Sequence, residues 1–447
     1  MGATSLLPAQ RGSVNKNGTE NNKIRPDDRA VHDWYRFVLA FPPHLVREYL
    51  EHFGITENEC VLDPFCGTGT TLVECKKMGI PSVGIEANPM SFFASQAKLN
   101  WSANPDGLMR HATDIAARAK RQLYADGLEE FNGLPLLSST RKPKTIRKLA
   151  PELEKLLLKN SISPLPLHRT LVLTEALEDH RDEEFYAHER LALAKAAVAT
   201  ASNLRFGPEV GVRAPKDDAP VVEAWMDALS QTADDLRLWQ SAKDVPARVC
   251  HADARDVHKV LPENSIAAVI TSPPYPNEKD YTRTTRLESV LLGLFKSKEE
   301  LRSFKKTLVR SNTRSVYKED DDDELVAGHS QIQRIANDIE ERRIAMGKTS
   351  GWERQYHRVT KLYFGGMARH LAGIRKVLRP GARLAYVVGD QASYLQVMIR
   401  TGQLLADIAA SLGFVVEDIA LFRTRRATAT RAELREEVVL LKWAGVR

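Results

Sequence analysis

The sequence has little cysteine and no long apolar run. Its four cysteines, at positions 60, 66, 75 and 250, include no Cys-x-x-Cys pair, so we expect reduced, buried thiols rather than disulfides or a zinc site. No stretch of eighteen apolar residues occurs, and the polar N-terminus lacks the apolar region of a signal peptide. These absences exclude a helical membrane protein and a disulfide-rich secreted protein, and we expect a cytoplasmic location.

The composition is that of a large globular protein. The 447 residues are 43% hydrophobic, enough for a sizeable core in one elaborated domain or two ordinary ones. The net charge of +6 is compatible with a polyanionic partner but does not identify one. Six consecutive acids occupy residues 319–324. We interpret them as a solvated loop, and we expect no metal site.

Short apolar runs, each followed by turn residues and a helical pattern, predict an α/β fold. Alternation of this kind is typical of a doubly wound, mostly parallel sheet. The predicted strands are residues 60–62, 82–85, 248–250, 267–270, 384–388, 414–419 and 437–441. The last two runs are separated by an Arg- and Ala-rich segment, which favours a hairpin at one edge of the sheet.

Two long stretches interrupt this alternation and suggest the domain organisation. Residues 105–245 show helical patterns separated by Pro-rich breaks, and residues 285–365 form a second, partly helical insert. The catalytic sheet is then expected in residues 30–104 and 246–447. Residues 1–29, rich in Asn, Gly, Lys and Arg, predict a disordered N-terminal arm.

A glycine turn follows the first predicted strand. In residues 61–71 the strand leads into Gly67 and Gly69, which let the backbone approach a ligand closely, and then into a helix N-terminus that favours a carboxylate. A dinucleotide site would need a third glycine where Leu72 stands, and the lysine of a phosphate-binding P-loop is absent.

Two acids lie where strands are expected to end. Glu86 closes the second strand, where a carboxylate can accept hydrogen bonds from both hydroxyls of a ribose. Asp253 follows the third strand and could accept from an adenine amino group. Either acid alone could be an ordinary surface residue. Their joint occurrence after the glycine turn, in this order, predicts a nucleoside-containing cofactor.

The fourth strand runs into Ser272-Pro273-Pro274-Tyr275. Two prolines remove two donors and stiffen the backbone, so the carbonyls of Ser272 and Pro273 can accept both hydrogens of an exocyclic amine and orient its lone pair. Tyr275 offers a flat face for an extruded base. Alone, the tetrapeptide could equally be a Pro-Pro turn with a packed tyrosine. No cysteine follows a proline, so methylation at carbon 5 of cytosine through a thiolate is not supported.

These motifs resemble those of the amino-methylating DNA methyltransferases of bacteria. Residues 63–70 look like motif I, residues 272–275 like motif IV, and residues 41–46 like motif X. The resemblance implies a class I, Rossmann-like fold with a seven-stranded sheet and S-adenosylmethionine as cofactor. The implied catalytic residues are Ser272, Pro273, Pro274 and Tyr275. The implied cofactor-binding residues are Phe41, Pro42, Asp63, Pro64, Phe65, Gly67, Gly69, Thr70, Glu86 and Asp253.

The resemblance also suggests the substrate. Serine at the first position of motif IV is typical of N4-cytosine enzymes, whereas Asp or Asn is typical of N6-adenine enzymes. We therefore expect base flipping in double-stranded DNA and methylation of cytosine N4. We expect residues 105–245 to read the target sequence, aided by residues 285–365, and a restriction enzyme of the same system could be a partner. The alternatives are adenine N6 in DNA, an amino nitrogen in RNA or protein, and a DNA-binding module with a decayed site. The oligomeric state is unreadable from the sequence.

Overall fold

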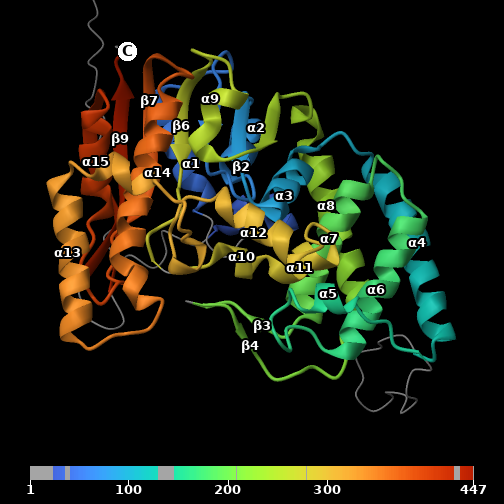
Figure 1. Cartoon of the computed structure of the whole chain (residues 1–447). Helices are drawn as coiled ribbons and strands as arrows, with labels where there is room; N and C mark the ends of the chain where they lie inside the picture. Colours follow the sequence, from blue (N-terminus) through green and yellow to red (C-terminus); the bar gives the residue numbers. More distant parts are fainter. Residues whose placement is uncertain are drawn as a thin grey trace, which may run out of the picture.

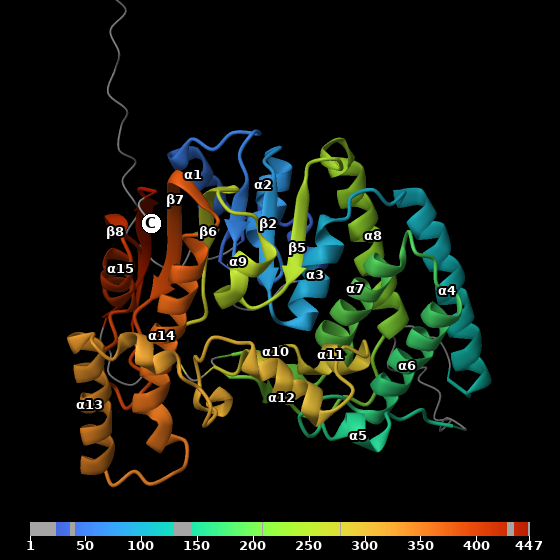
Figure 2. The same cartoon turned by 45° about the horizontal axis from the view of Figure 1, so that its top comes forward.

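The core of the protein is a seven-stranded sheet with strand order β5-β2-β1-β6-β7-β9-β8. The computed structural model describes residues 24–35, 41–128, 145–207, 209–277, 279–426 and 433–445. In chain order the strands are β1 (Val61–Asp63), β2 (Ser82–Glu86), β5 (Ala247–His251), β6 (Ile266–Thr271), β7 (Leu378–Gly389), β8 (Phe414–Arg426) and β9 (Glu433–Trp443). Figure 2 shows them side by side, from β8 at the left to β5 at the right. This arrangement confirms the expected class I, Rossmann-like sheet.

Strand direction follows from how the strands are connected. β5, β2, β1, β6 and β7 pair in parallel, whereas β9 runs antiparallel between β7 and β8. The predicted edge hairpin is therefore confirmed, and its strands extend well beyond the predicted runs. The chain order reverses between β1 and β6, and ligands of such sheets bind outside the carboxyl ends of the strands at that point.

Helices cover both faces of the sheet, which is why the parallel strands are continuously apolar. Val61, Ala268 and Ile270 pack with α1 and α2 on one face. Leu62 and Val269 pack with α14 and α15 on the other. The flanking helices are α1 (Pro43–Phe53), α2 (Thr70–Lys77), α3 (Pro89–Leu99), α9 (Val257–Val260), α14 (Tyr356–Ile374) and α15 (Thr401–Ser411).

The first insert, residues 105–245, forms a helical layer beyond the β5 edge of the sheet (Figures 1 and 2). Its elements are α4 (Pro105–Ala125), α5 (Pro151–Glu154), α6 (Pro164–Asp179), α7 (Tyr186–Ala196), a π-helical turn (Ala197–Ala201), β3 (Leu204–Arg205), β4 (Gly211–Val212) and α8 (Val221–Trp239). Leu108 and Trp225 of the insert share one hydrophobic cluster with Val73 of α2 and Met90 of α3. The insert therefore continues the core of the sheet domain.

The second insert lies below the carboxyl ends of the strands (Figure 2). It contains α11 (Arg286–Leu291), α12 (Lys298–Lys306) and α13 (Ser330–Ala345), and the short helix α10 (Tyr281–Thr284) precedes it. Residues 356–365, which fall within the predicted insert, form the first half of α14 and pack against the sheet domain.

The interpretation of the six acids as a solvated loop holds for Glu319, Asp321 and Glu324, which are exposed, but is wrong for Asp322. Asp322 is 3% exposed, and its carboxylate pairs with Arg255 and Arg369. Asp320 forms a bidentate ion pair with the buried Arg310. The sequence pattern could not predict these ion pairs, because the arginines that form them are distant from the run along the chain.

The N-terminal segment joins the fold earlier than the sequence suggested. Pro26–Asp28 form a 3₁₀ turn, and the buried Asp28 accepts a hydrogen bond from Arg47 on α1. The predicted end of a disordered arm at Arg29 is therefore too far along the chain. Residues 1–23 lie outside the described residues, and disorder there stays a prediction.

Candidate active site

A cavity of about 990 Å³ opens at the carboxyl ends of the central strands. Its volume is at the upper end of the range for ligand pockets, about 300–1,000 Å³. Among the predicted site residues, its wall contains Phe41, Pro42, Pro64, Phe65, Gly67, Thr70, Glu86, Asp253, Ser272, Pro273, Pro274 and Tyr275. The cavity therefore joins the predicted cofactor residues and the tetrapeptide in one continuous space. Asp63 and Gly69 are not part of its wall.

The two glycines of the turn have different surroundings. Both have positive φ, 53° at Gly67 and 86° at Gly69, a conformation that side chains with a Cβ rarely adopt. A Cβ at Gly67 would meet no atom within 4 Å, whereas one at Gly69 would lie 2.6 Å from Ser95 Oγ. Gly67 thus leaves open space on the cavity side, and Gly69 allows the turn to pack against α3.

Asp63 is a structural carboxylate beneath the turn. It is completely buried and accepts hydrogen bonds from Thr71 Oγ1 (2.7 Å), Thr271 Oγ1 (2.6 Å) and the backbone N–H of Phe65 (3.1 Å). Burial raises its pKa to about 6. These contacts join the ends of β1 and β6 to α2. Asp63 therefore fixes the positions of the glycine turn and the tetrapeptide relative to each other.

Glu86, by contrast, faces the cavity. Its Oε2 accepts from the backbone N–H of Gly67 at 2.8 Å, and its Oε1 accepts from that of Asn88 at 2.6 Å. Burial raises its pKa to about 7. A carboxylate has about four acceptor sites, so this arrangement leaves acceptors for a ligand's hydroxyls.

Asp253 is held by a neighbouring arginine. Its Oδ1 accepts from the backbone N–H of Arg255 (2.9 Å) and its Oδ2 from Arg255 Nη2 (2.6 Å), while Nε lies 3.1 Å from both oxygens. Most of the acceptor capacity of Asp253 is therefore already used.

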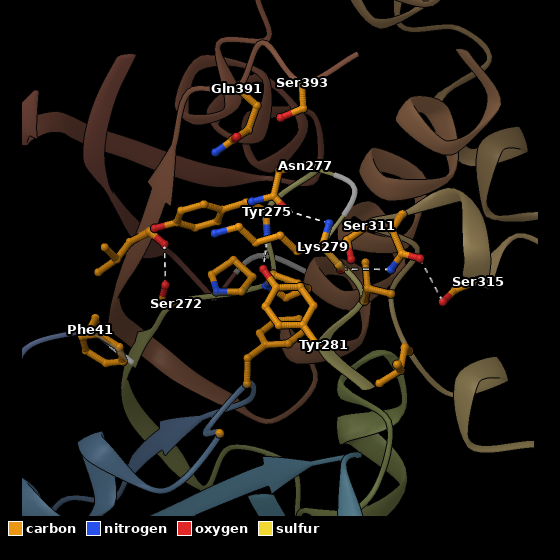
Figure 3. Close-up of a pocket in the computed structure, with 18 of the residues that line it drawn as sticks. Phe41, Ser272, Tyr275, Asn277, Lys279, Tyr281, Ser311, Ser315, Gln391 and Ser393 are labelled. Carbon is orange, nitrogen blue, oxygen red and sulfur yellow. Dashed lines mark hydrogen bonds between the residues drawn. The ribbon is translucent and has the colours of Figure 1, made fainter. Parts of the chain in front are cut away.

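The tetrapeptide crosses the cavity between the turn and β7. Ser272 Oγ donates to the carbonyl of Val387 at 3.1 Å, and the backbone N–H of Tyr275 donates to Tyr281 Oη at 3.3 Å. The Tyr275 ring packs against Gly389, where a Cβ would lie 3.0 Å from the ring. Figure 3 shows Ser272 and Tyr275 on the same side of the pocket, with Phe41 nearby. Both ends of the tetrapeptide are thus anchored.

Sequence reasoning missed a set of charged and polar residues opposite the cofactor turn. Glu436 on β9 is 8% exposed, and both its oxygens accept from Arg423 of β8, at 2.6 and 2.8 Å. Lys279 extends across the pocket beside Tyr275 in Figure 3, and its backbone carbonyl accepts from Asn312 at 3.1 Å. The available indication for Glu436 was the pair of acids, Glu436 and Glu437, that precedes the apolar run of β9. No comparable pattern marks Lys279.

Comparison with known proteins is consistent with this geometry. Residues 10–95 match a family model described as DNA methylase, which covers N6 and N4 enzymes. The type II methyltransferase M.BsoBI of Geobacillus stearothermophilus is 25% identical over 433 residues, covering 90% of this chain and 82% of the relative. These similarities support an amino-methylating DNA methyltransferase. The type II methyltransferase M.AvaI of Nostoc sp. strain PCC 7120 is 24% identical to this methyltransferase, with 92% and 83% coverage.

Among solved structures, the rRNA methyltransferase aviRa from Streptomyces viridochromogenes is 11% identical, with 93% and 91% coverage and a TM-score of 0.32. The methyl donor of this DNA methyltransferase is S-adenosylmethionine. The residues present fit that group, because Gly67 leaves open space at the turn and Glu86 keeps acceptors for ribose hydroxyls. Among the described residues, no helix is long and apolar enough to cross a membrane.

Proposed function

We propose that this enzyme methylates the exocyclic N4 of cytosine in double-stranded DNA after the base is flipped into the cavity. The observation that carries the proposal is the single cavity in which Gly67 and Glu86 share a wall with Ser272 and Tyr275. An amine held at the tetrapeptide would therefore lie in the same space as the methyl donor. The preference for cytosine rests on Ser272 and on the family resemblance.

Each residue of the tetrapeptide has a proposed role. The backbone carbonyls of Ser272 and Pro273 accept the two hydrogens of the amine, which directs its lone pair toward the cofactor. Pro274 keeps this backbone rigid. Tyr275, supported by Gly389, stacks on the flipped base. Because the Ser272 hydroxyl donates to Val387, Ser272 is held in one orientation.

The cofactor residues divide along the wall. Phe41 and Pro42 enclose the methionine end, and the N-terminus of α2 at Thr70 favours its carboxylate. Glu86 accepts from the ribose, and Asp253 accepts from the adenine amino group. The bound cofactor supplies an electrophilic methyl group on a sulfonium. The protein holds the amine in line with it and excludes water.

Covalent catalysis by cysteine is disfavoured in the structure as well as in the sequence. Cys66 is in the cavity wall, but its side chain is only 4% exposed. Burial raises the pKa of its thiol well above the ordinary value, which disfavours the nucleophilic thiolate. This environment supports transfer to an amine nitrogen rather than to carbon 5.

DNA is proposed to approach from the side of the two inserts. The β3–β4 hairpin contributes Glu209 to the cavity wall, and the second insert contributes Lys348 at its rim. Arg314 stacks on the exposed Trp352, 4.9 Å from the ring centroid, and each is the sequence neighbour of a residue of the cavity wall, Ser315 and Glu353 respectively. Because the first insert shares the core of the sheet, deleting it would expose apolar surface. Exchange of exposed residues is therefore the better test of target recognition.

The relatives M.BsoBI and M.AvaI are named as type II methyltransferases. We extend this to the proposal that the enzyme belongs to a restriction–modification system, with a restriction enzyme for the same DNA sequence. A chromosomal DNA substrate would also require a cytoplasmic location.

Expression in a host without DNA methylation tests the proposed function. Sequencing of the modified genome should show N4-methylcytosine in one short sequence context, and a host expressing Tyr275→Ala should show a smaller modified fraction at the same sites. N6-methyladenine at the sites would refute the choice of base. If the genome stays unmodified while RNA or protein receives the methyl group of labelled S-adenosylmethionine, the choice of substrate is wrong.

A further inference from the structure

The buried part of the acidic run reaches the cofactor pocket through one arginine. Asp322 Oδ2 accepts from Arg255 Nη1 at 2.6 Å, and both side chains are largely buried, 4% and 12% exposed. The same guanidinium donates through Nε and Nη2 to Asp253. Arg255 thus joins an acid of the second insert to an acid at the end of β5.

Asp322 is held in place by backbone packing and by a second ion pair. The turn Asp322–Val326 packs directly on α14, where a Cβ at Gly365 would lie 1.7 Å from the Asp322 carbonyl oxygen. Arg369 of α14 pairs with the second oxygen of Asp322 at 2.8 Å. The carboxylate of Asp322 therefore has a defined position from which to hold the guanidinium.

Only one member of the trio reaches the cavity. Asp253 is part of the cavity wall, whereas Arg255 and Asp322 lie behind it. A carboxylate offers about four acceptor sites. The backbone N–H, Nε and Nη2 of Arg255 occupy most of them, which leaves Asp253 about one acceptor for a ligand and a single orientation in which to present it.

We propose that Asp322 is a positioning residue for adenine recognition, acting through Arg255 on Asp253. The proposal rests on the proposed contact between Asp253 and the adenine amino group. It gives the second insert a role in cofactor selection besides any contact with DNA. Without Asp322, Arg255 loses one of its two carboxylate partners, and the acceptor that Asp253 presents is no longer fixed in direction.

The same run provides a matched control. The side chain of Asp320 is only 8% exposed and also forms an ion pair with an arginine, since Arg310 donates to it at 2.8 and 3.0 Å. Among the described residues, Asp320 forms no hydrogen bond or ion pair with Arg255 or Asp253, and its carboxylate instead accepts from Arg310 and the backbone N–H of Tyr317. Asp320→Asn therefore removes a largely covered charge from this segment while both carboxylate partners of Arg255 stay in place. The two ion pairs share only one acceptor, the Lys306 carbonyl, to which Arg255 and Arg310 both donate.

The test combines a substitution in the protein with removal of the 6-amino group from the adenine of the ligand, and compares the loss of affinity that removal causes in each variant. Calorimetry would give the Kd of S-adenosylhomocysteine and of its analogue without that amino group, for wild type, Asp322→Asn and Asp320→Asn. In wild type and Asp320→Asn, loss of the amino group should weaken binding about tenfold, as for a hydrogen bond to a charged group. In Asp322→Asn, the same change should cost less than about threefold.

The outcomes separate this inference from the proposed function. If removal of the amino group weakens binding equally in wild type and Asp322→Asn, the role of Asp322 is wrong and the adenine contact stands. Equal affinity of wild type for both ligands would show that Asp253 does not bind the amino group. If wild type binds neither ligand, the cofactor site itself is wrong. If Asp322→Asn fails to fold, Arg255→Lys, which keeps the charge but loses the two-pronged contact, carries the same test.

Discussion

Asp63 and Glu86 show how two acids at neighbouring strand ends can have different roles. Both are buried enough for the pKa to rise, to about 6 and about 7 respectively. Asp63 has all its contacts within the protein, from two threonine hydroxyls and a backbone N–H. Glu86 keeps acceptors directed into the cavity. Only Glu86 should therefore couple cofactor binding to pH.

Cofactor affinity should rise with pH and level off above about 7. The ionised form of Glu86 is the better acceptor for ribose hydroxyls, so below this pKa the Kd should increase by up to about tenfold per pH unit. Glu86→Gln should bind more weakly at high pH and should lose this dependence. Calorimetry with S-adenosylhomocysteine between pH 5.5 and 8.5 provides the measurement.

Stability of the ligand-free protein supplies the control for Glu86, because its pH dependence has the opposite sign. The folded-state pKa is above the model-peptide value of 4.5, so the carboxyl contributes stability below about pH 4.5 that is lost as pH rises through 7. Glu86→Gln should flatten this part of the stability profile. Parallel pH profiles of binding in wild type and Glu86→Gln would contradict the assignment to the ribose.

Tyr275→Ala should reduce methylation by removing the stacking platform. Stacking of a base on an aromatic ring contributes about 1–3 kcal/mol, which corresponds to roughly 5- to 150-fold in kcat/KM for DNA. Tyr275→Phe keeps the ring against Gly389 and should stay close to wild type. Full turnover by Tyr275→Ala, measured with labelled cofactor and duplex DNA, would exclude the flipped-base arrangement.

At the residue scale, the sequence predicted which side chains stand at strand ends but not which way they point. Ser272, Tyr275 and Glu86 are in the cavity wall as expected. Asp63 is turned inward because its donors Thr71 and Thr271 come from other elements. Such partners are far apart in sequence, so no local pattern could reveal them.

At the scale of elements, the contact between the acidic turn and α14 depends on Gly365. A Cβ there would overlap the Asp322 carbonyl, so Gly365→Ala must displace the turn. Overpacking of this kind costs about 1–3 kcal/mol. We expect a lower temperature of thermal unfolding and weaker binding of S-adenosylhomocysteine.

Gly328→Ala is the matched control in the same insert. A Cβ at this position would meet no atom within 4 Å, and its φ is not in the left-handed region, so stability should change little or rise slightly. Equal unfolding temperatures for Gly365→Ala and wild type would contradict the close contact between the turn and the helix.

The strands of the sheet could be predicted because their burial on both faces leaves continuous apolar runs. The full lengths of β8 and β9 could not, since their outer parts are mixed in polarity and are held by pairing with each other. The burial of Asp322 depends on Arg255 and on the glycines of α14, which are distant in sequence. A run of acids alone favours solvent.

At the scale of the whole molecule, the inserts are part of one structure with the sheet. Helices of the first insert share a hydrophobic cluster with α2 and α3. The second insert lies across the carboxyl ends of the strands and contributes Phe304 and Val309 to the cavity wall. The sequence predicted two inserts, but the second was predicted to run into residues 356–365, which belong to α14. The packing of the inserts depends on surface complementarity between distant segments.

The central claim is methyl transfer to cytosine N4 at the tetrapeptide, and nucleoside mass spectrometry tests it most directly. Purified enzyme would be incubated with duplex DNA and isotopically labelled S-adenosylmethionine, and the DNA would then be digested to nucleosides. We predict labelled N4-methyldeoxycytidine, strongly reduced with Tyr275→Ala. Label in N6-methyldeoxyadenosine or 5-methyldeoxycytidine instead would contradict the account.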